Sequence, residues 1–239
     1  MIILSIDTSD TQGSVAVRKS GKLASSLLHS GGEDYSSWLI PAVHSVLGET
    51  GCELGQLDLL AVCTGPGSFT GLRVGLTTVK AWAEIYGRRI VGVPRLEALS
   101  RNSTRGFPFV LACYDAQRGQ NFAALYWRKS NALQLMNAEL VATPEEILQF
   151  VAQYAGNAPV EWVQLGRDTI STAPGWPGRE ACGDVLTLSP PNLAATIALR
   201  AEEYAAKGQF TDVLQLDANY VRRSDAEIFW KGPAKRVPR

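Results

Sequence analysis

The sequence predicts an α/β protein built from two units in tandem. A strand–turn–strand signal occurs twice along the 239 residues, once from residue 2 and again from about residue 107. Hydrophobic residues make up 46% of the chain, which is enough to bury a core in one large or two small domains. We expect an N-terminal unit over residues 1–102 and a C-terminal unit over residues 103–239.

The first unit reads as strands alternating with helices. Residues 2–6 form a short apolar run typical of a buried strand, residues 13–30 read as two strands joined at Ser20-Gly21, and residues 57–65 as a fourth. In residues 34–50 the apolar positions repeat with helical spacing, which predicts a helix capped by Ser36 or Ser37 and stopped by Gly48. Pro41 must then lie in or near the first turn, or kink the helix.

The stretch "CTGPGSFTGLRVGLTTVKAW", residues 63–82, places four glycines between an apolar run and a helical pattern. A Walker phosphate loop needs a lysine and a hydroxyl after its last glycine, whereas Leu72 and Arg73 follow Gly71. The dinucleotide fingerprint would require one residue fewer between the glycines, and a nucleophile elbow would require glycines two residues on each side of Ser68. The pattern instead predicts a sharp strand-to-helix turn, capped by Ser68 or Thr70, and a helix that ends at Gly87.

Two of these glycines, Gly71 and Gly75, lie one helical turn apart. A glycine inside a helix costs about 1 kcal/mol relative to alanine, so two on one face indicate that another element approaches closely. That element is either part of this chain or a second chain, and the pattern alone favours internal packing.

The second unit repeats the arrangement after the strand of residues 89–93. Residues 107–140 read as three strands with turns at residues 117–119 and 130–131, and Thr143 and Pro144 begin a helix. Residues 160–166 read as a strand, and residues 172–188, rich in proline and glycine, as a loop. A clear helix follows near residues 192–207, with a stripe that could pack back on the first unit.

Charge and composition exclude several functions. Both Lys+Arg and Asp+Glu number 23, so no global field attracts nucleic acid or an anionic membrane. The two histidines, His29 and His44, are too few for a metal site, and no segment is long enough to span a bilayer. The opening "MIILSID" lacks the basic region of a signal peptide, and we expect a cytoplasmic protein with reduced thiols. Those thiols belong to Cys52, Cys63, Cys113 and Cys182.

Four segments, "ILSIDTSDTQGSVAV", "TGPGSFTGLRVG", "DAQRGQNFAALYW" and "YVRR", resemble the bacterial TsaB (YeaZ) family in order and spacing. The resemblance covers nearly the whole chain and implies a duplicated actin/Hsp70-like (ASKHA) α/β fold, related to the glycoprotease group. It also implies a non-catalytic partner of TsaD, the transferase that makes N6-threonylcarbamoyladenosine in tRNAs reading codons that begin with A. The resemblance further implies that a TsaE-like ATPase joins that complex, that tRNA meets the chain through it, and that the chain alone forms a homodimer.

The resemblance also implies which surface meets the partner. In the family, the helix after the GPGSFTG segment and the helix before it pack against matching helices of TsaD or of a second TsaB. The departure at Tyr35, where many relatives have histidine, leaves the role of that position open. The residues carried over to this interface are Tyr35, Trp38, Leu39, Val43, Gly71, Leu72, Gly75, Leu76 and Val79.

Both hairpins depart from the phosphate turns of active actin-like proteins, which carry D-x-G-x-T/S. In the first hairpin, Asp7 and Thr8 are followed by Ser9 in place of glycine and by a second carboxylate, Asp10; both changes oppose phosphate. The second turn, from Asp115 to Gly119, offers a single late glycine, although Arg118 could still meet a phosphate. The alternative is that both are simple tight turns. We expect no cofactor and no metal on this chain, and expect ATP and metal on the partner subunits.

The basic end of the chain could touch tRNA phosphates or be a solvated terminus. Its charged residues are Arg222, Arg223, Lys231, Lys235, Arg236 and Arg239.

Two other classes of function compete with the scaffold hypothesis. The first is an enzyme in its own right, either a small-molecule kinase or ATPase of the actin-like superfamily or a glycoprotease-type peptidase. The second is a self-associating structural protein.

Overall fold

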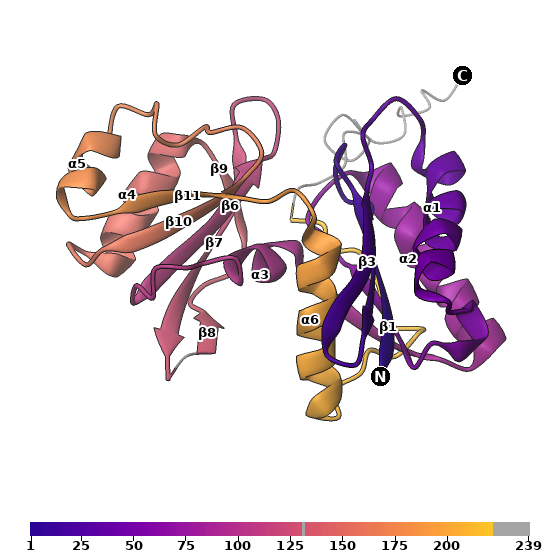
Figure 1. Ribbon diagram of the computed structural model, residues 1–239. Helices are drawn as coiled ribbons and strands as arrows, with labels where there is room; N and C mark the ends of the chain where they lie inside the picture. Colours follow the sequence, from indigo (N-terminus) through magenta and orange to yellow (C-terminus); the bar gives the residue numbers. More distant parts are fainter. Residues whose placement is uncertain (131, 222–239) are drawn as a thin grey trace, which may run out of the picture.

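A computed structural model describes residues 1–130 and 132–221; the basic residues from Arg222 onward lie outside this range. Two sheets stand side by side, each with helices on its faces (Figure 1). The first has the strand order β3-β2-β1-β4-β5 and the second the order β11-β10-β6-β7-β8, with β9 paired to β7. The first sheet contains β1 (Ile2–Asp7), β2 (Ser14–Lys19), β3 (Lys22–Leu28), β4 (Leu59–Cys63) and β5 (Arg89–Val93). The second contains β6 (Phe109–Asp115), β7 (Asn121–Lys129), β8 (Ala132–Leu135), β9 (Leu140–Ala142), β10 (Val160–Leu165) and β11 (Val185–Ser189).

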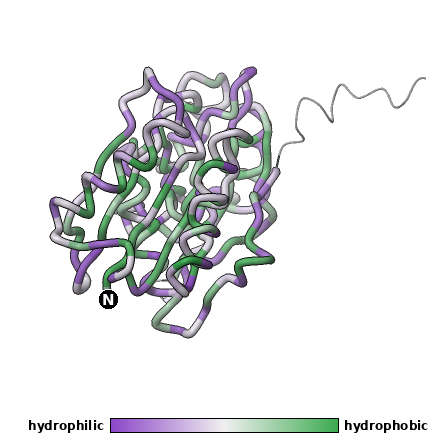
Figure 2. Tube along the Cα trace, turned by 90° about the vertical axis from the view of Figure 1, so that its right-hand side faces the viewer, coloured by the Kyte–Doolittle hydropathy of each residue, from purple (hydrophilic) through white to green (hydrophobic). Residues whose placement is uncertain are grey.

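Both sheets are mixed, and each begins with an antiparallel hairpin. Strand β1 pairs antiparallel with β2 and parallel with β4, and β6 repeats this with β7 and β10. The hydrophobic strands run through the interior while the hydrophilic segments gather in loops at the periphery (Figure 2). The helices are α1 (Tyr35–Thr50), α2 (Phe69–Tyr86), α3 (Arg95–Ser100), α4 (Pro144–Ala155), α5 (Trp176–Ala181), α6 (Leu193–Ala206) and the short 3-10 helix η1 (Leu54–Gln56).

Helix α1 is longer at both ends than the sequence predicts. It begins after Asp34, so neither Ser36 nor Ser37 caps it, and it ends at Gly51, whose φ of 63° is left-handed. Gly51 and Cys52 donate to the carbonyls of Gly48 and Leu47 and close the end of the helix, which is why Gly48 itself does not stop it. Pro41 lies inside α1 rather than in its first turn.

Local capping signals give both ends of α2 and the start of α4 correctly. The hydroxyl of Ser68 accepts the N–H of Gly71 at the start of α2, and Gly87 ends α2 in the left-handed conformation. At α4, Thr143 and Glu146 form a reciprocal capping box, with Pro144 in the first turn. These predictions are confirmed.

The prediction of loop over residues 172–188 is wrong, because this region contains α5 and β11. Trp176, buried at the start of α5, packs edge-on against Trp162, with ring centroids 5.5 Å apart, and β11 adds to β10 in parallel. Pro177 starts the helix instead of breaking it. Long-range packing here overrides the local proline and glycine signals.

Helix α6 leaves the second sheet and covers the face of the first sheet opposite α1 and α2 (Figure 1). The Ser5 hydroxyl donates to the carbonyl of Ala194 (2.7 Å), and the Ala194 N–H donates to the Ser14 hydroxyl (3.0 Å). After α6 the chain continues along the first unit, where Thr211 bridges Ile90 in β5. The C-terminal part of the described chain therefore joins the two units.

Candidate functional site

The first turn, residues 8–13, joins β1 to β2. The last residue of β1, Asp7, is fully buried. Ser9 donates to Asp7 Oδ1 from its backbone N–H (3.0 Å) and also from its hydroxyl. One oxygen of the carboxylate is thus occupied by the residue that stands where phosphate-binding turns have glycine.

The other oxygen of Asp7 faces Arg95, the first residue of α3. Arg95 Nε lies 3.7 Å from Asp7 Oδ2, and its Nη1 and Nη2 lie 3.2 and 3.3 Å from Asp10 Oδ2. The guanidinium also stacks on Tyr114, 4.3 Å from the ring centroid. Burial by itself would lower the pKa of Arg95, but the charge of Asp7 above all raises it, so the guanidinium stays charged.

The glycines of the GPGSFTG segment allow α2 to lie directly on this first turn. Thr8 donates from its hydroxyl to the carbonyl of Gly71 (2.7 Å), and Ser68 donates its N–H to the carbonyl of Ser9 (2.6 Å). A Cβ at Gly71 would overlap the Thr8 carbonyl, and a Cβ at Gly75 would lie 2.5 Å from Thr8 Oγ1. The close approach that these glycines permit is therefore within this chain.

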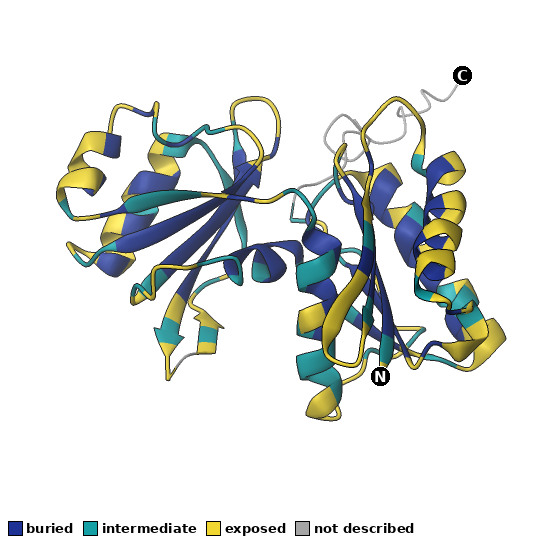
Figure 3. Ribbon diagram, in the orientation of Figure 1, coloured by how far each residue is buried: buried dark blue, intermediate teal, exposed yellow. Residues whose placement is uncertain are grey.

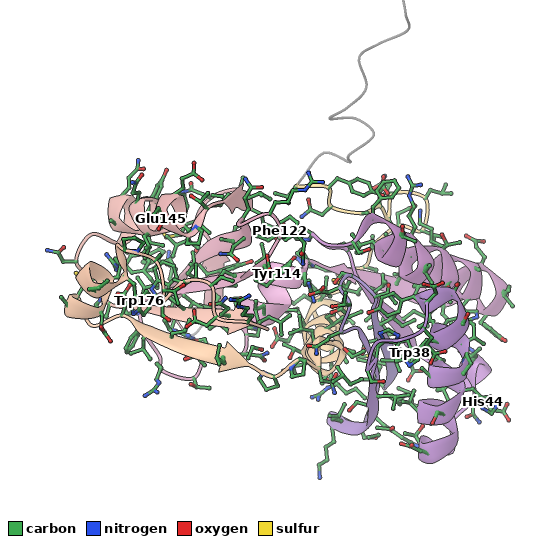
Figure 4. All side chains as sticks on the ribbon, turned by 90° about the horizontal axis from the view of Figure 1, so that it is seen from above. Trp38, His44, Tyr114, Phe122, Glu145 and Trp176 are labelled. Carbon is green, nitrogen blue, oxygen red and sulfur yellow. The ribbon has the colours of Figure 1, made fainter. Side chains whose placement is uncertain are left out.

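The nine residues predicted for the partner interface lie mainly in the chain's own core. Leu39, Val43, Leu72, Leu76 and Val79 are buried between α1, α2 and the first sheet, and Gly71, Gly75 and Trp38 are buried as well. Figure 4 shows Trp38 on the inner side of α1, whereas His44 lies at the outer edge. These side chains pack within this chain, because an apolar stripe marks the face that packs on the helix's own sheet.

Tyr35 is half-buried and belongs to the rim of the first turn. Its hydroxyl donates to the carbonyl of Asp10, and its ring lies against His29, with centroids 4.7 Å apart. The ring nitrogens of the buried His29 lie 2.9 and 3.0 Å from the carbonyl oxygens of Thr11 and Glu33. Tyr35 therefore connects the start of α1 to the first hairpin.

An exposed groove lies over the start of α2, on the side away from the sheet. Its volume is about 540 Å³, and the outer surfaces of α1 and α2 that flank it are exposed (Figure 3). The guanidinium of Arg73 lies 3.7 Å from the centroid of the Phe69 ring, which is 40% exposed. The residues carried over from the family resemblance lie on the opposite, buried face of these helices. That prediction therefore does not include the lining residues Ser36, Phe69, Thr70, Arg73, Val74, Thr77 and Thr78.

The second turn faces the first across a cleft of about 620 Å³ between the two units. Asp115 Oδ1 accepts the N–H of Gln117, and Gln117 and Arg118 take left-handed φ values of 66° and 58°. Figure 4 places Tyr114 between the two halves, where its hydroxyl donates to the carbonyl of Pro66 (2.6 Å). The structure thus brings Ser9, Asp115 and Arg118 to the lining of one cleft.

Within residues 1–130 and 132–221, no three His, Cys, Asp or Glu side chains gather where they could hold a metal ion. No helix in that part of the chain has the length and hydrophobicity needed to cross a bilayer.

Comparisons with known proteins identify the family. Residues 29–172 match the family model "TsaD: tRNA N6-adenosine threonylcarbamoyltransferase". The "tRNA threonylcarbamoyladenosine biosynthesis protein TsaB" of Bacillus subtilis is 30% identical over 236 residues, 96% of this chain and 98% of that protein. The chain belongs to the TsaB family.

Solved structures show the same fold. A Pseudomonas aeruginosa protein described as similar to the peptidase YeaZ is 27% identical and superposes with a TM-score of 0.74 over 92% of this chain and 99% of its own. The activator of the 2-hydroxyisocaproyl-CoA dehydratase from Clostridium difficile, with bound ADPNP, superposes with a TM-score of 0.54 at 12% identity, covering 87% and 97%. Likeness at 12% identity shows the fold alone. The predicted duplicated actin-like α/β fold is confirmed for this TsaB-family chain.

The actin-like fold implies a phosphate group and its metal ion as ligands beside the first turn. The residues of the first turn in this chain fit neither of them. Ser9 uses one oxygen of Asp7, and the Arg95 guanidinium stands beside the other. A divalent cation would have to displace a buried arginine that is already paired with both Asp7 and Asp10.

Proposed function

We propose that this TsaB-family chain is a non-catalytic subunit of the complex that forms N6-threonylcarbamoyladenosine in tRNAs reading codons that begin with A. In this proposal it binds and activates a TsaD-like transferase in the cytoplasm. A TsaE-like ATPase and tRNA meet it through that complex, and ATP and metal are held by the partner subunits. Without its partner, the chain forms a homodimer.

The observation that carries the proposal is the arrangement of charges at the first turn, where Arg95 pairs with Asp7 and Asp10. The relatives of this chain are named for this tRNA modification. A phosphoryl-transfer site in this fold needs space and positive potential for phosphates beside the first turn. Here the carboxylate of Asp7 is already neutralised by Arg95, and Asp10 adds a second negative charge at the rim. These features favour a role in assembly over a free-standing ATPase or kinase.

The exposed groove over α2 supports a helical partner surface at this position. Its lining consists of hydroxyl and apolar side chains, with Arg73 as the one charged residue, and that guanidinium is stacked on Phe69. A surface poor in charge loses little solvation when covered, which suits a protein–protein interface. We place the interface on this outer face of α1 and α2 rather than on their buried stripes.

Depletion of the protein in cells tests this function. We expect the threonylcarbamoyladenosine content of these tRNAs to fall while formation of the threonylcarbamoyl-adenylate precursor continues, as measured by mass spectrometry of tRNA nucleosides. Re-expression of the wild-type chain and of Asp7→Asn is the matched comparison. Restoration by both supports a non-catalytic role, whereas an unchanged tRNA level on depletion would remove the assignment.

A further inference from the structure

Arg95 lies at the carboxyl ends of the parallel strands of the first sheet, where open α/β sheets bind ligands. Strands β1, β4 and β5 are parallel to one another, and they end at Asp7, Cys63 and Val93. Arg95 follows β5 by two residues and projects into this position, beside the cleft.

One positive charge, the guanidinium of Arg95, faces two carboxylates at this position. Asp7 is 0% exposed and Arg95 is 1% exposed, and a buried charge needs a partner of opposite sign. Asp7 Oδ2 and Arg95 Nε make no hydrogen bond among the described residues, yet they face each other at 3.7 Å. The terminal nitrogens of the guanidinium reach Asp10, and its face lies on Tyr114.

We propose that Arg95 is the resident cation of this cleft and that it excludes divalent metal ions from the first turn. Asp7 and Asp10 supply the carboxylate oxygens that Mg²⁺ and Mn²⁺ prefer, but the guanidinium stands between them. A second cation at this place would meet the repulsion of a buried positive charge. Without that charge, the same two carboxylates form a divalent-cation site that opens onto the cleft.

Titration with Mn²⁺, followed by the paramagnetic resonance signal of the free ion, tests this role. We expect no Asp7-dependent site in the wild type and one site in Arg95→Met, bound at least about tenfold more tightly than any wild-type binding. Arg95→Lys, which keeps the charge, is the matched control and is expected to gain no site. Asp7→Asn in the Arg95→Met background is expected to abolish the new site.

Two results would overturn the inference: Asp7-dependent Mn²⁺ binding by the wild type, or a folded Arg95→Met variant that binds no more tightly than the wild type. Should Arg95→Met fail to fold because Asp7 is left unpaired, Mn²⁺ added on refolding becomes the readout. The ion is then expected to restore folding of Arg95→Met, and not to raise the melting temperature of the double variant that also carries Asp7→Asn. Failure of Mn²⁺ to restore folding would equally overturn the role of Arg95 as a substitute for a metal ion.

Discussion

Gly75 and Thr8 lie so close together that a Cβ on Gly75 would be 2.5 Å from the hydroxyl oxygen of Thr8. That hydroxyl donates to the carbonyl of Gly71 one helical turn earlier. The first turn of the chain and the first two turns of α2 are thus packed as one unit. The absence of side chains at the two glycines is what permits the contact.

Replacement of Gly75 by leucine is therefore expected to destabilise the isolated protein. The side chain must displace Thr8, an overpacking cost of about 1–3 kcal/mol, and break its hydrogen bond to Gly71, which costs about 1 kcal/mol more. Together these costs exceed the gain of about 1 kcal/mol in helix propensity. Urea denaturation would measure the free energy of unfolding. The control is Gly48→Ala in α1, where a Cβ meets nothing within 4 Å and stability is expected to rise. An unchanged stability of Gly75→Leu would contradict the internal contact.

Local signals in the sequence predict most of the strands, both ends of α2 and the start of α4, because caps such as Ser68 and Thr143 act within a few residues. They did not predict what covers each face. The family resemblance places the apolar stripe of α2 against a partner, whereas this chain's own first sheet covers it. The burial of Arg95 was equally hidden, because its partner Asp7 is distant in sequence and reaches it only through the order of the strands.

The groove over α2 gives the partner proposal a direct test. Thr77 is exposed and lines this groove, so Thr77→Arg places a charge where a partner would have to desolvate it. We expect the dissociation constant for the TsaD-like transferase to rise about tenfold to hundredfold, while the stability of the isolated chain stays unchanged. Calorimetric titration would measure the affinity.

The matched control is Gln149→Arg, on the exposed face of α4 in the second unit. It adds the same charge to a helix outside the proposed interface and is expected to leave binding unchanged. Equal affinities for Thr77→Arg and the wild type would place the interface elsewhere.

Asp184 joins α5 to β10 in residues 172–188, the region that the sequence predicts as loop. Its carboxylate accepts from Arg179 Nε (2.8 Å) and from Trp162 Nε1 (2.7 Å), and all three side chains are buried. Asp184→Ala would leave a buried guanidinium without its counter-charge, which costs about 3–5 kcal/mol. Thermal unfolding followed by tryptophan fluorescence would detect the loss. The neighbouring exposed Glu180→Ala serves as the control, and equal melting temperatures of the two variants would refute the role of Asp184.

Glu139 makes stability depend on pH. It is half-buried and accepts a hydrogen bond from the Asn219 side chain, which joins the second unit to the C-terminal segment. Burial, and to a lesser degree the charge of Glu97, raise the pKa of Glu139 from its ordinary value of 4.5 to about 7, although the bond from Asn219 opposes the shift. Between these values the folded protein holds a proton that the unfolded chain releases.

The contribution of that proton is fully present below the unfolded pKa and is lost as the pH rises through the folded pKa, so stability is expected to fall between about pH 4.5 and 7. Its full size is on the order of 3 kcal/mol. Glu139→Gln keeps an oxygen that can accept from Asn219 but has no charge at any pH. Relative to the wild type, this variant is therefore expected to become progressively more stable as the pH rises to about 8. Urea denaturation across this range, with the exposed Glu145→Gln as control, would measure the difference; a constant difference between Glu139→Gln and the wild type would show that the pKa of Glu139 is unshifted.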